Sequence, residues 1–178
     1  GVPDASESFI EEAQSNGVKA YAIEGDLSID GAMNEIYDRA LGELGQIDIL
    51  VSNANIQIVS LFEDVTTEDI DLQCRMNYRI PIQLLQRAMP PMADRGWGRV
   101  LTIGSINQAN PIIELAVYAG LKSAQYNLVK NLSRKYVTTG VTINNLSPGL
   151  IETDRNRFRR ENPRDWQEMI ERTSPMGR

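Results

Sequence analysis

Histidine is absent from this chain of 178 residues, and cysteine occurs only once. Without an imidazole, the chain cannot build a Ser-His-Asp triad, a Cys-His pair or a histidine-ligated zinc site, and we expect no metal site. Cys74 has no partner for an intrachain disulfide and lies in a helical pattern. It is expected to be a small buried apolar side chain in a protein of the reducing cytoplasm.

Long apolar runs and an excess of basic residues are also missing. The longest apolar stretches have the length of strands, far below the ~20 residues that cross a bilayer. The net charge is −6, whereas phosphate binding needs clustered cations. We therefore expect neither a nucleic acid nor a membrane as the main partner. Basic residues cluster in one segment only, which is expected to be a solvated helix face or, alternatively, a site for an anionic substrate. Its arginines are Arg155, Arg157, Arg159, Arg160 and Arg164.

Helical and strand patterns alternate along the sequence. Hydrophobic residues make up 42% of it, enough for a substantial core in a single domain over residues 1–178. Candidate N-caps are Ser28 or Asp30 for the second helix and Thr66 or Thr67 for the third. Such alternation is typical of an α/β fold with a parallel sheet. The predicted helices are residues 5–16, 28–44, 66–93 and 117–136, and the predicted strands are residues 18–24, 47–51, 99–103 and 141–146.

Tyr118 and Lys122 are the most informative pair. Four residues apart on a helix, they project from the same face, so the ammonium can stabilise the phenolate. A phenol of pKa ~10 shifted in this way can exchange a proton with an alcohol or a carbonyl. The pair alone is weak evidence, because an exposed helical face explains it equally well.

Further motifs stand in a fixed order around this pair. Together they resemble the classical short-chain dehydrogenase/reductase family over residues 25–153. The resemblance implies a Rossmann-type doubly wound parallel sheet, partial in this sequence, and an NAD- or NADP-dependent oxidoreductase that interconverts a secondary alcohol and a ketone by hydride transfer. The matching segments are Asp26-Leu27, Ser52-Asn53-Ala54-Asn55, Asn77, Ser105, Tyr118 with Lys122, and Pro148-Gly149 with Ile151 and Thr153.

The same resemblance assigns roles. Tyr118 is the acid or base at the substrate oxygen, Lys122 assists it and binds the nicotinamide ribose, and Ser105 donates a hydrogen bond to that oxygen. Ser105, Asn107 and Tyr118 are the expected substrate contacts. The expected cofactor-binding residues are Asp26, Leu27, Asn53, Ala54, Asn55, Tyr118, Lys122, Pro148, Gly149, Ile151 and Thr153.

Each of these residues has a simpler explanation. Ser105 could satisfy a strand end, Thr153 could be an N-cap, Asp26 a turn residue and Pro148 part of an ordinary turn. Their joint order at the carboxyl ends of predicted strands favours the functional interpretation. Asn55 departs from the family, which has Gly there, and Asn tolerates left-handed geometry better than other side chains.

Asn77 is the fourth predicted catalytic residue. Pro81 lies four residues later and has no N–H to donate to the Asn77 carbonyl. In the family the matching carbonyl holds a water that leads to the lysine, and Pro81 would leave that carbonyl free. The alternative is a proline kink that only bends the helix around the core.

The family's Gly-rich turn has no counterpart here, and the family normally continues beyond Arg178. We therefore interpret the sequence as an internal fragment, in which the substrate and the choice between NAD and NADP stay open. The alternative is a non-catalytic fragment or homologue that retains the fold for assembly. A homodimer or homotetramer is expected through apolar side chains of the helices that hold Asn77 and Tyr118: Ile80, Leu84, Leu85, Met89, Leu128 and Leu132.

Overall fold

The computed structural model describes residues 3–153, 157 and 160–174. Its α-helices are α1 (Pro3–Ser15), α2 (Ala32–Leu44), α3 (Thr67–Cys74), α4 (Ile80–Asp94), α5 (Ala116–Tyr136) and α6 (Pro163–Thr173). Its strands are β1 (Ile49–Ser52), β2 (Gly98–Ile103) and β3 (Val141–Leu146). Short helical turns are η1 (Phe62–Asp64), η3 (Ile106–Gln108), η4 (Ile113–Leu115) and η5 (Val137–Thr139), and η2 (Arg75–Arg79) is a π-helix.

The three strands form one parallel sheet in the order β1-β2-β3. Ile49 pairs with Arg99 between β1 and β2, and Gly98 pairs with Val141 between β2 and β3. Helices connect the strands, since α3, η2 and α4 lie between β1 and β2, and α5 lies between β2 and β3. The predicted α/β fold with a parallel sheet is therefore confirmed, and the predicted bounds of β3 coincide with those observed.

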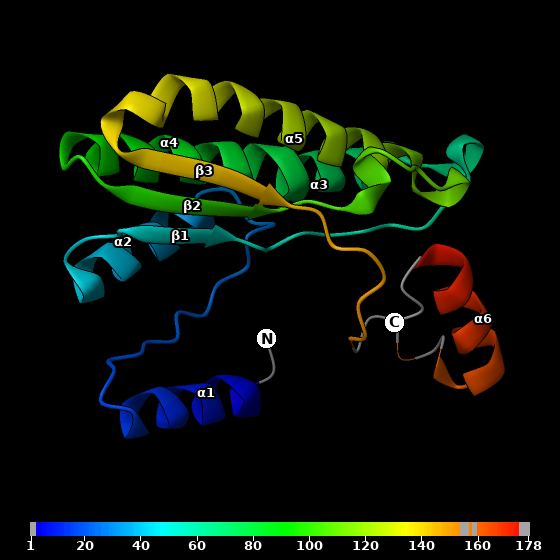
Figure 1. Ribbon diagram of the computed structural model, residues 1–178, viewed down its shortest axis with the longest axis horizontal. Helices are drawn as coiled ribbons and strands as arrows, with labels where there is room; N and C mark the ends of the chain where they lie inside the picture. The colour runs from blue at the N-terminus through cyan, green and yellow to red at the C-terminus, as the bar shows by residue number, and fades with distance from the viewer. Residues whose placement is uncertain (1–2, 154–156, 158–159, 175–178) are drawn as a thin grey trace.

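The core lies on the face of the sheet covered by α4 and α5 (Figure 1). Val100, Val141 and Ile143 occupy this face because alternate residues of paired strands share a side. Met33 and Tyr37 bring α2 into the same cluster. The residues of the opposite face include exposed Ile49 and Val51 of β1. In Figure 1, α1 and α6 lie apart from the sheet and its helices.

The apolar side chains predicted to form a subunit interface pack instead within the chain. Ile80, Leu85 and Met89 are buried members of the core, and Leu84, Leu128 and Leu132 are partly buried against it. Their hydrophobicity is thus explained by the sheet that they cover. The expectation of a homo-oligomer loses this support and stays a prediction.

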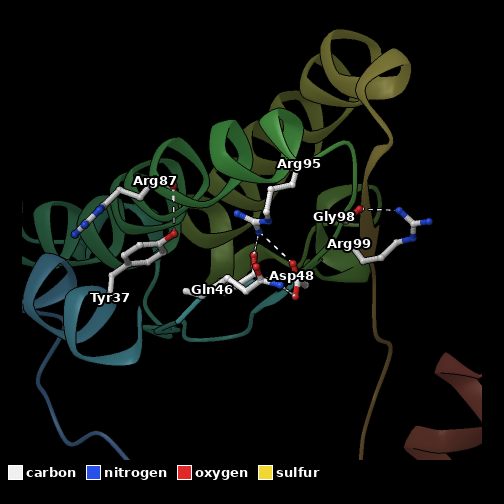
Figure 2. Close-up of polar contacts among 8 residues, drawn as sticks. Tyr37, Gln46, Asp48, Arg87, Arg95, Gly98 and Arg99 are labelled. Carbon is white, nitrogen blue, oxygen red and sulfur yellow. Dashed lines mark hydrogen bonds and ion pairs between the residues drawn. The ribbon is translucent and has the colours of Figure 1, made fainter. Parts of the chain in front are cut away.

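Arg87 of α4 and Arg95, the residue that follows this helix, attach it to its neighbours. The Tyr37 hydroxyl donates to the Arg87 carbonyl at 3.2 Å (Figure 2). The Arg87 guanidinium stacks over the Tyr37 ring and pairs with Asp38. Burial raises the pKa of the Tyr37 phenol. Just after α4, the Arg95 guanidinium pairs at 3.1 Å with Asp48, the residue before β1. These contacts fix α2 and β1 relative to α4.

Two local predictions were wrong. Residues 18–24 form no strand, because within the described residues β1 pairs only with β2 and the segment has no ladder of backbone hydrogen bonds. The second helix begins after Gly31, with φ of 89°, and not after Ser28 or Asp30. The Asp30 carboxylate is engaged by Arg75 instead of capping the helix.

The third predicted helix is interrupted once. Thr66, one of the two predicted caps, caps α3, and the structure adds a reciprocal capping box with Asp69. The five residues of η2 then adopt π geometry, and the Ile80 N–H reaches the Arg75 carbonyl. Pro81 follows in the first turn of α4, where a missing N–H is tolerated. Among the described helices, none combines the length and the apolar character needed to span a membrane.

Candidate active site

The carboxyl ends of the three parallel strands meet at one edge of the sheet, where most of the predicted residues follow them. Residues 53–55 come after β1, Ser105 after β2, and Pro148 after β3. The Gly104 N–H donates to the Leu146 carbonyl at 2.7 Å, and the Ile106 N–H to the Pro148 carbonyl at 3.1 Å. These bonds place the turns after β2 and β3 side by side.

Ser105 caps the turn η3. Its Oγ accepts a hydrogen bond from the Asn107 N–H at 3.2 Å, and the Gln108 side chain returns to the Ser105 N–H at 3.5 Å. Ser105 therefore does satisfy the end of a strand, as the simpler explanation stated. This role does not exclude a functional one, because the Ser105 hydroxyl accepts the bond from Asn107 and can still donate its own hydrogen to a substrate oxygen.

A network of amides supports this turn, and the sequence analysis missed it. Asn145 of β3 accepts from the buried Thr102 hydroxyl at 2.9 Å and donates to Gln108 at 3.3 Å and to Ser147 at 3.0 Å. A Cβ on Gly104 would lie 2.5 Å from the Asn145 amide nitrogen, so only glycine leaves room for this crossing. No signal in the sequence points to this network, because an amide side chain does not indicate which distant residue it will bind.

Tyr118 and Lys122 lie in the first turns of α5 and are both buried, with exposed fractions of 5% and 2%. The Lys122 Nζ lies 5.7 Å from the centroid of the Tyr118 ring. It also donates to the Ile103 carbonyl of β2 at 2.8 Å. The exposed helical face proposed as the simpler explanation is thus wrong. The helix instead buries a cation beside a phenol, next to the turn that holds Ser105.

Asn77 is fully buried in η2, and its side chain makes two bonds to one residue. Oδ1 accepts from the Ile56 N–H at 3.0 Å, and Nδ2 donates to the Ile56 carbonyl at 2.8 Å. The sequence predicted a role for the main-chain carbonyl only. The π geometry of η2 agrees with a local departure from regular helix before Pro81, and the free carbonyl stays a prediction.

Asp26 and Leu27 precede α2. The Asp26 carboxylate accepts from the Ser28 N–H at 2.8 Å, and the hydrogen bonds from Ser28 lower the pKa of Asp26 below its usual range. Asp26 is thus a turn residue in this structure, as the simpler explanation stated. Leu27 packs partly buried against the core.

Asn55 does not use left-handed geometry. No described residue other than glycine has a positive φ, so the suggestion that Asn replaces the family's Gly in that conformation is wrong. The Asn55 side chain donates to the Asn53 carbonyl at 2.9 Å, just after β1. Asn53 and Ala54 are exposed at this edge of the sheet.

The segment after Pro148 is exposed at Gly149, Ile151 and Thr153. The Thr153 carbonyl accepts from the Arg160 guanidinium at 3.2 Å, and Arg160 also pairs with Glu152. Thr153 is not the N-cap of a described helix. Of the arginine-rich segment, Arg155 and Arg159 lie outside the described residues. Arg164 pairs with Glu168 one turn along α6, which agrees with a solvated helix face.

A model of the short chain dehydrogenase family matches residues 2–164. The curated acetoacetyl-CoA reductase of Cupriavidus necator is 30% identical over 148 residues, which are 83% of this chain and 60% of that protein. The chain thus spans about three fifths of the length of this relative.

Two solved structures are similar over most of the chain. A 3-oxoacyl (acyl-carrier-protein) reductase from Agrobacterium tumefaciens C58, with NADP bound, has a TM-score of 0.91 and 37% identity, covering 99% of this chain and 68% of the other. A 7α-hydroxysteroid dehydrogenase complexed with NADH and 7-oxo glycochenodeoxycholic acid has a TM-score of 0.80 and 30% identity, covering 87% of this chain and 60% of the other.

Proposed function

The chain belongs to the short chain dehydrogenase family, with its Rossmann-type α/β fold, and from this premise we propose an NAD(P)-dependent oxidoreductase that interconverts a secondary alcohol and a ketone. The single observation that carries the proposal is the buried pair of Tyr118 and Lys122 beside the Ser105 turn. A buried cation next to a phenol favours the phenolate, which suits proton exchange with an alcohol.

Each of the three side chains has a distinct task. In ketone reduction, Tyr118 donates its phenolic proton to the substrate oxygen, and in alcohol oxidation its phenolate accepts that proton. Ser105 donates a hydrogen bond to the same oxygen. Lys122 keeps its positive charge beside the phenol in both directions. The nicotinamide, when bound, supplies or accepts the hydride at the substrate carbon.

The residues at the carboxyl edge fit a dinucleotide of this kind. A Cβ on Gly149 would meet no atom of the chain within 4 Å, so a ligand can approach the exposed backbone there. Asn53 and Ala54 are exposed after β1. We assign the nicotinamide side to Gly149, Ile151 and Thr153, with Pro148 shaping their turn, and the ribose to Lys122 and residues 53–55.

At the far end, Asp26 and Leu27 are proposed to contact the adenine. The relatives support both nicotinamide cofactors, because one solved structure holds NADP and the other NADH. Their substrates are ketones or the matching alcohols by name, which supports a small-molecule substrate that contacts Ser105, Asn107 and Tyr118. The cytoplasm is retained as the proposed location and a homo-oligomer as the proposed assembly.

The test uses the complete protein with a panel of ketones and secondary alcohols and with NAD(H) and NADP(H). Tyr118→Phe removes the proton donor and keeps the ring, so turnover is expected to fall by about 10²-fold or more with unchanged cofactor binding. Lys122→Ala is expected to lower turnover and also to weaken cofactor binding. Near-normal turnover of Tyr118→Phe on every substrate that the unaltered protein converts would exclude the proposed role. A folded protein without turnover or nucleotide binding would favour the non-catalytic alternative.

A further inference from the structure

Gln125 is a polar residue on the buried face of α5, where apolar side chains are usual. The buried residues of this helix recur on its inner face, where Ala119 and Val129 are apolar and Gln125 is 2% exposed. A buried amide must find hydrogen-bond partners or lose free energy on folding. The contacts of Gln125 therefore indicate why a polar side chain stands at this position.

Those contacts close a triangle around Lys122. The Lys122 Nζ donates to the Gln125 Oε1 at 3.3 Å and to the Ile103 carbonyl at 2.8 Å. The Gln125 Nε2 donates to the same Ile103 carbonyl at 3.3 Å. The amide thus joins the ammonium to strand β2, close to the point where the strand leads into Ser105.

The chemistry of an amide suits this place. An ammonium that is 2% exposed has lost most of its hydration and needs oxygen acceptors. A carboxylate would supply one but would cancel the positive charge, whereas an amide oxygen stabilises the charge and leaves it in place. The full charge of Lys122 then acts on the Tyr118 ring, whose centroid is 5.7 Å from Nζ.

Other ionisable groups near α5 are less able to set this charge. Each lies on an element packed against α5 and is at least partly exposed, so water screens it. They are Glu68, Asp69, Asp71 and Cys74 of α3, Arg75, Tyr78 and Arg79 of η2, and Glu114 of η4. Tyr118 and Lys122 itself are the buried ionisable groups of α5 within the described residues.

We propose that Gln125 is a positioning residue, which holds the ammonium of Lys122 against the Ile103 carbonyl so that its charge acts on Tyr118. The inference rests on the proposed function and adds to it a residue that makes no contact with substrate or cofactor. Removing the amide oxygen frees the ammonium from its place, and adding a carboxylate neutralises it. Both changes make the Tyr118 phenol harder to ionise.

The experiment compares Gln125→Met and Gln125→Glu with the unaltered complete protein. Methionine matches glutamine in length without its amide, and glutamate matches its shape with a negative charge. Gln73→Met is the control, because Gln73 is equally buried, on α3, and its change reports the effect of losing a buried glutamine alone. Ionisation of Tyr118 is followed by the ultraviolet absorbance of tyrosinate, taken as the difference between each protein and its Tyr118→Phe derivative.

The midpoint of Tyr118 ionisation is expected to rise by about half a pH unit in Gln125→Met and by about one unit or more in Gln125→Glu. The pH profile of kcat/KM for alcohol oxidation should shift upward by the same amounts, and Gln73→Met should shift neither. Unchanged midpoints in both Gln125 variants would overturn the inference, and if only one variant folds, its midpoint decides alone. The titration needs no turnover, so this failure is distinct from failure of the proposed function, which the unaltered protein reports by its own activity.

Discussion

The side-chain amide of Asn77 pairs with both backbone groups of Ile56, accepting from its N–H at 3.0 Å and donating to its carbonyl at 2.8 Å. The contact joins the π-helix η2 to the segment that follows β1. Residues 53–55 lie just before Ile56, so Asn77 holds the backbone next to a predicted cofactor-binding segment. Asn77 was selected from the sequence for its main-chain oxygen, and the structure adds a contact made by its side chain.

We predict that Asn77→Leu lowers the free energy of unfolding by about 2 kcal/mol or more, because it leaves two part-buried backbone groups of Ile56 without partners. Urea unfolding measures the change. Asn127→Ala, at an exposed position of α5, is the control and is expected to change stability by about 0.5 kcal/mol at most. A cost for Asn77→Leu as small as that of the control would show that the pairing contributes little.

Local signals in the sequence were sufficient for the elements of the core. The bounds of β3 were predicted from its apolar run between Gly140 and Pro148, and Thr66 was one of the two predicted N-caps of α3. Residues 18–24 show the limit, because an apolar segment becomes a strand only when another strand pairs with it. Pairing of that kind is set by distant residues and not by the segment itself.

The candidate site also has parts that the sequence predicted and parts that it did not. The pair of Tyr118 and Lys122 was predictable because residues four apart on a helix share a face. The bonds that support the site connect residues far apart in the sequence, as between Asn77 and Ile56 or between Asn145 and Gln108. An amide carries no signal for its distant partner, so these contacts appear only in the fold.

Gly140 makes the turn from η5 into β3, and we predict that Gly140→Ala lowers the free energy of unfolding by about 2 kcal/mol or more. Its φ is 77°, and a Cβ there would lie 1.9 Å from the Gly96 carbonyl oxygen. Gly120→Ala is the matched control, because Gly120 lies within α5 and its Cβ would meet no atom within 4 Å. The control should gain about 0.5–1 kcal/mol in urea unfolding. Equal effects of the two changes would contradict this account of the turn.

Gln73 is expected to destabilise the fold. It is 1% exposed, and its Oε1 has no hydrogen-bond partner within the described residues. We predict that Gln73→Met raises the free energy of unfolding by about 1 kcal/mol, because it removes a buried acceptor and keeps the volume. A thermal unfolding midpoint above that of the unaltered protein would agree with this. A lower midpoint would mean that the amide has a partner that stabilises it.

The contact between Asp38 and Arg87 makes the free energy of unfolding depend on pH in the acid range, and the direction of the Asp38 pKa shift determines the sign. The hydrogen bond from Arg87 holds the pKa of Asp38 below its usual range. An unfolded aspartate has a pKa near ~3.9, so the stabilisation is present above that pH and is lost as the pH falls through the lower folded value. We predict that Asp38→Asn is less stable than the unaltered protein at neutral pH, and that the difference shrinks as the pH falls below about 4.

The same comparison in an Arg87→Met background isolates the pair. Methionine keeps an apolar stem against the Tyr37 ring, over which the Arg87 guanidinium lies at 4.3 Å, and removes the charge. In that background Asp38→Asn is expected to have a smaller effect at neutral pH, with less change on acidification. Urea midpoints of the four proteins at neutral and at acid pH complete the cycle. If the effect of Asp38→Asn were the same at both pH values with Arg87 present, the carboxylate would not be linked to folding through this arginine. Arg87 would then hold α2 to α4 by its stacking on Tyr37 and its hydrogen bonds to Asn34.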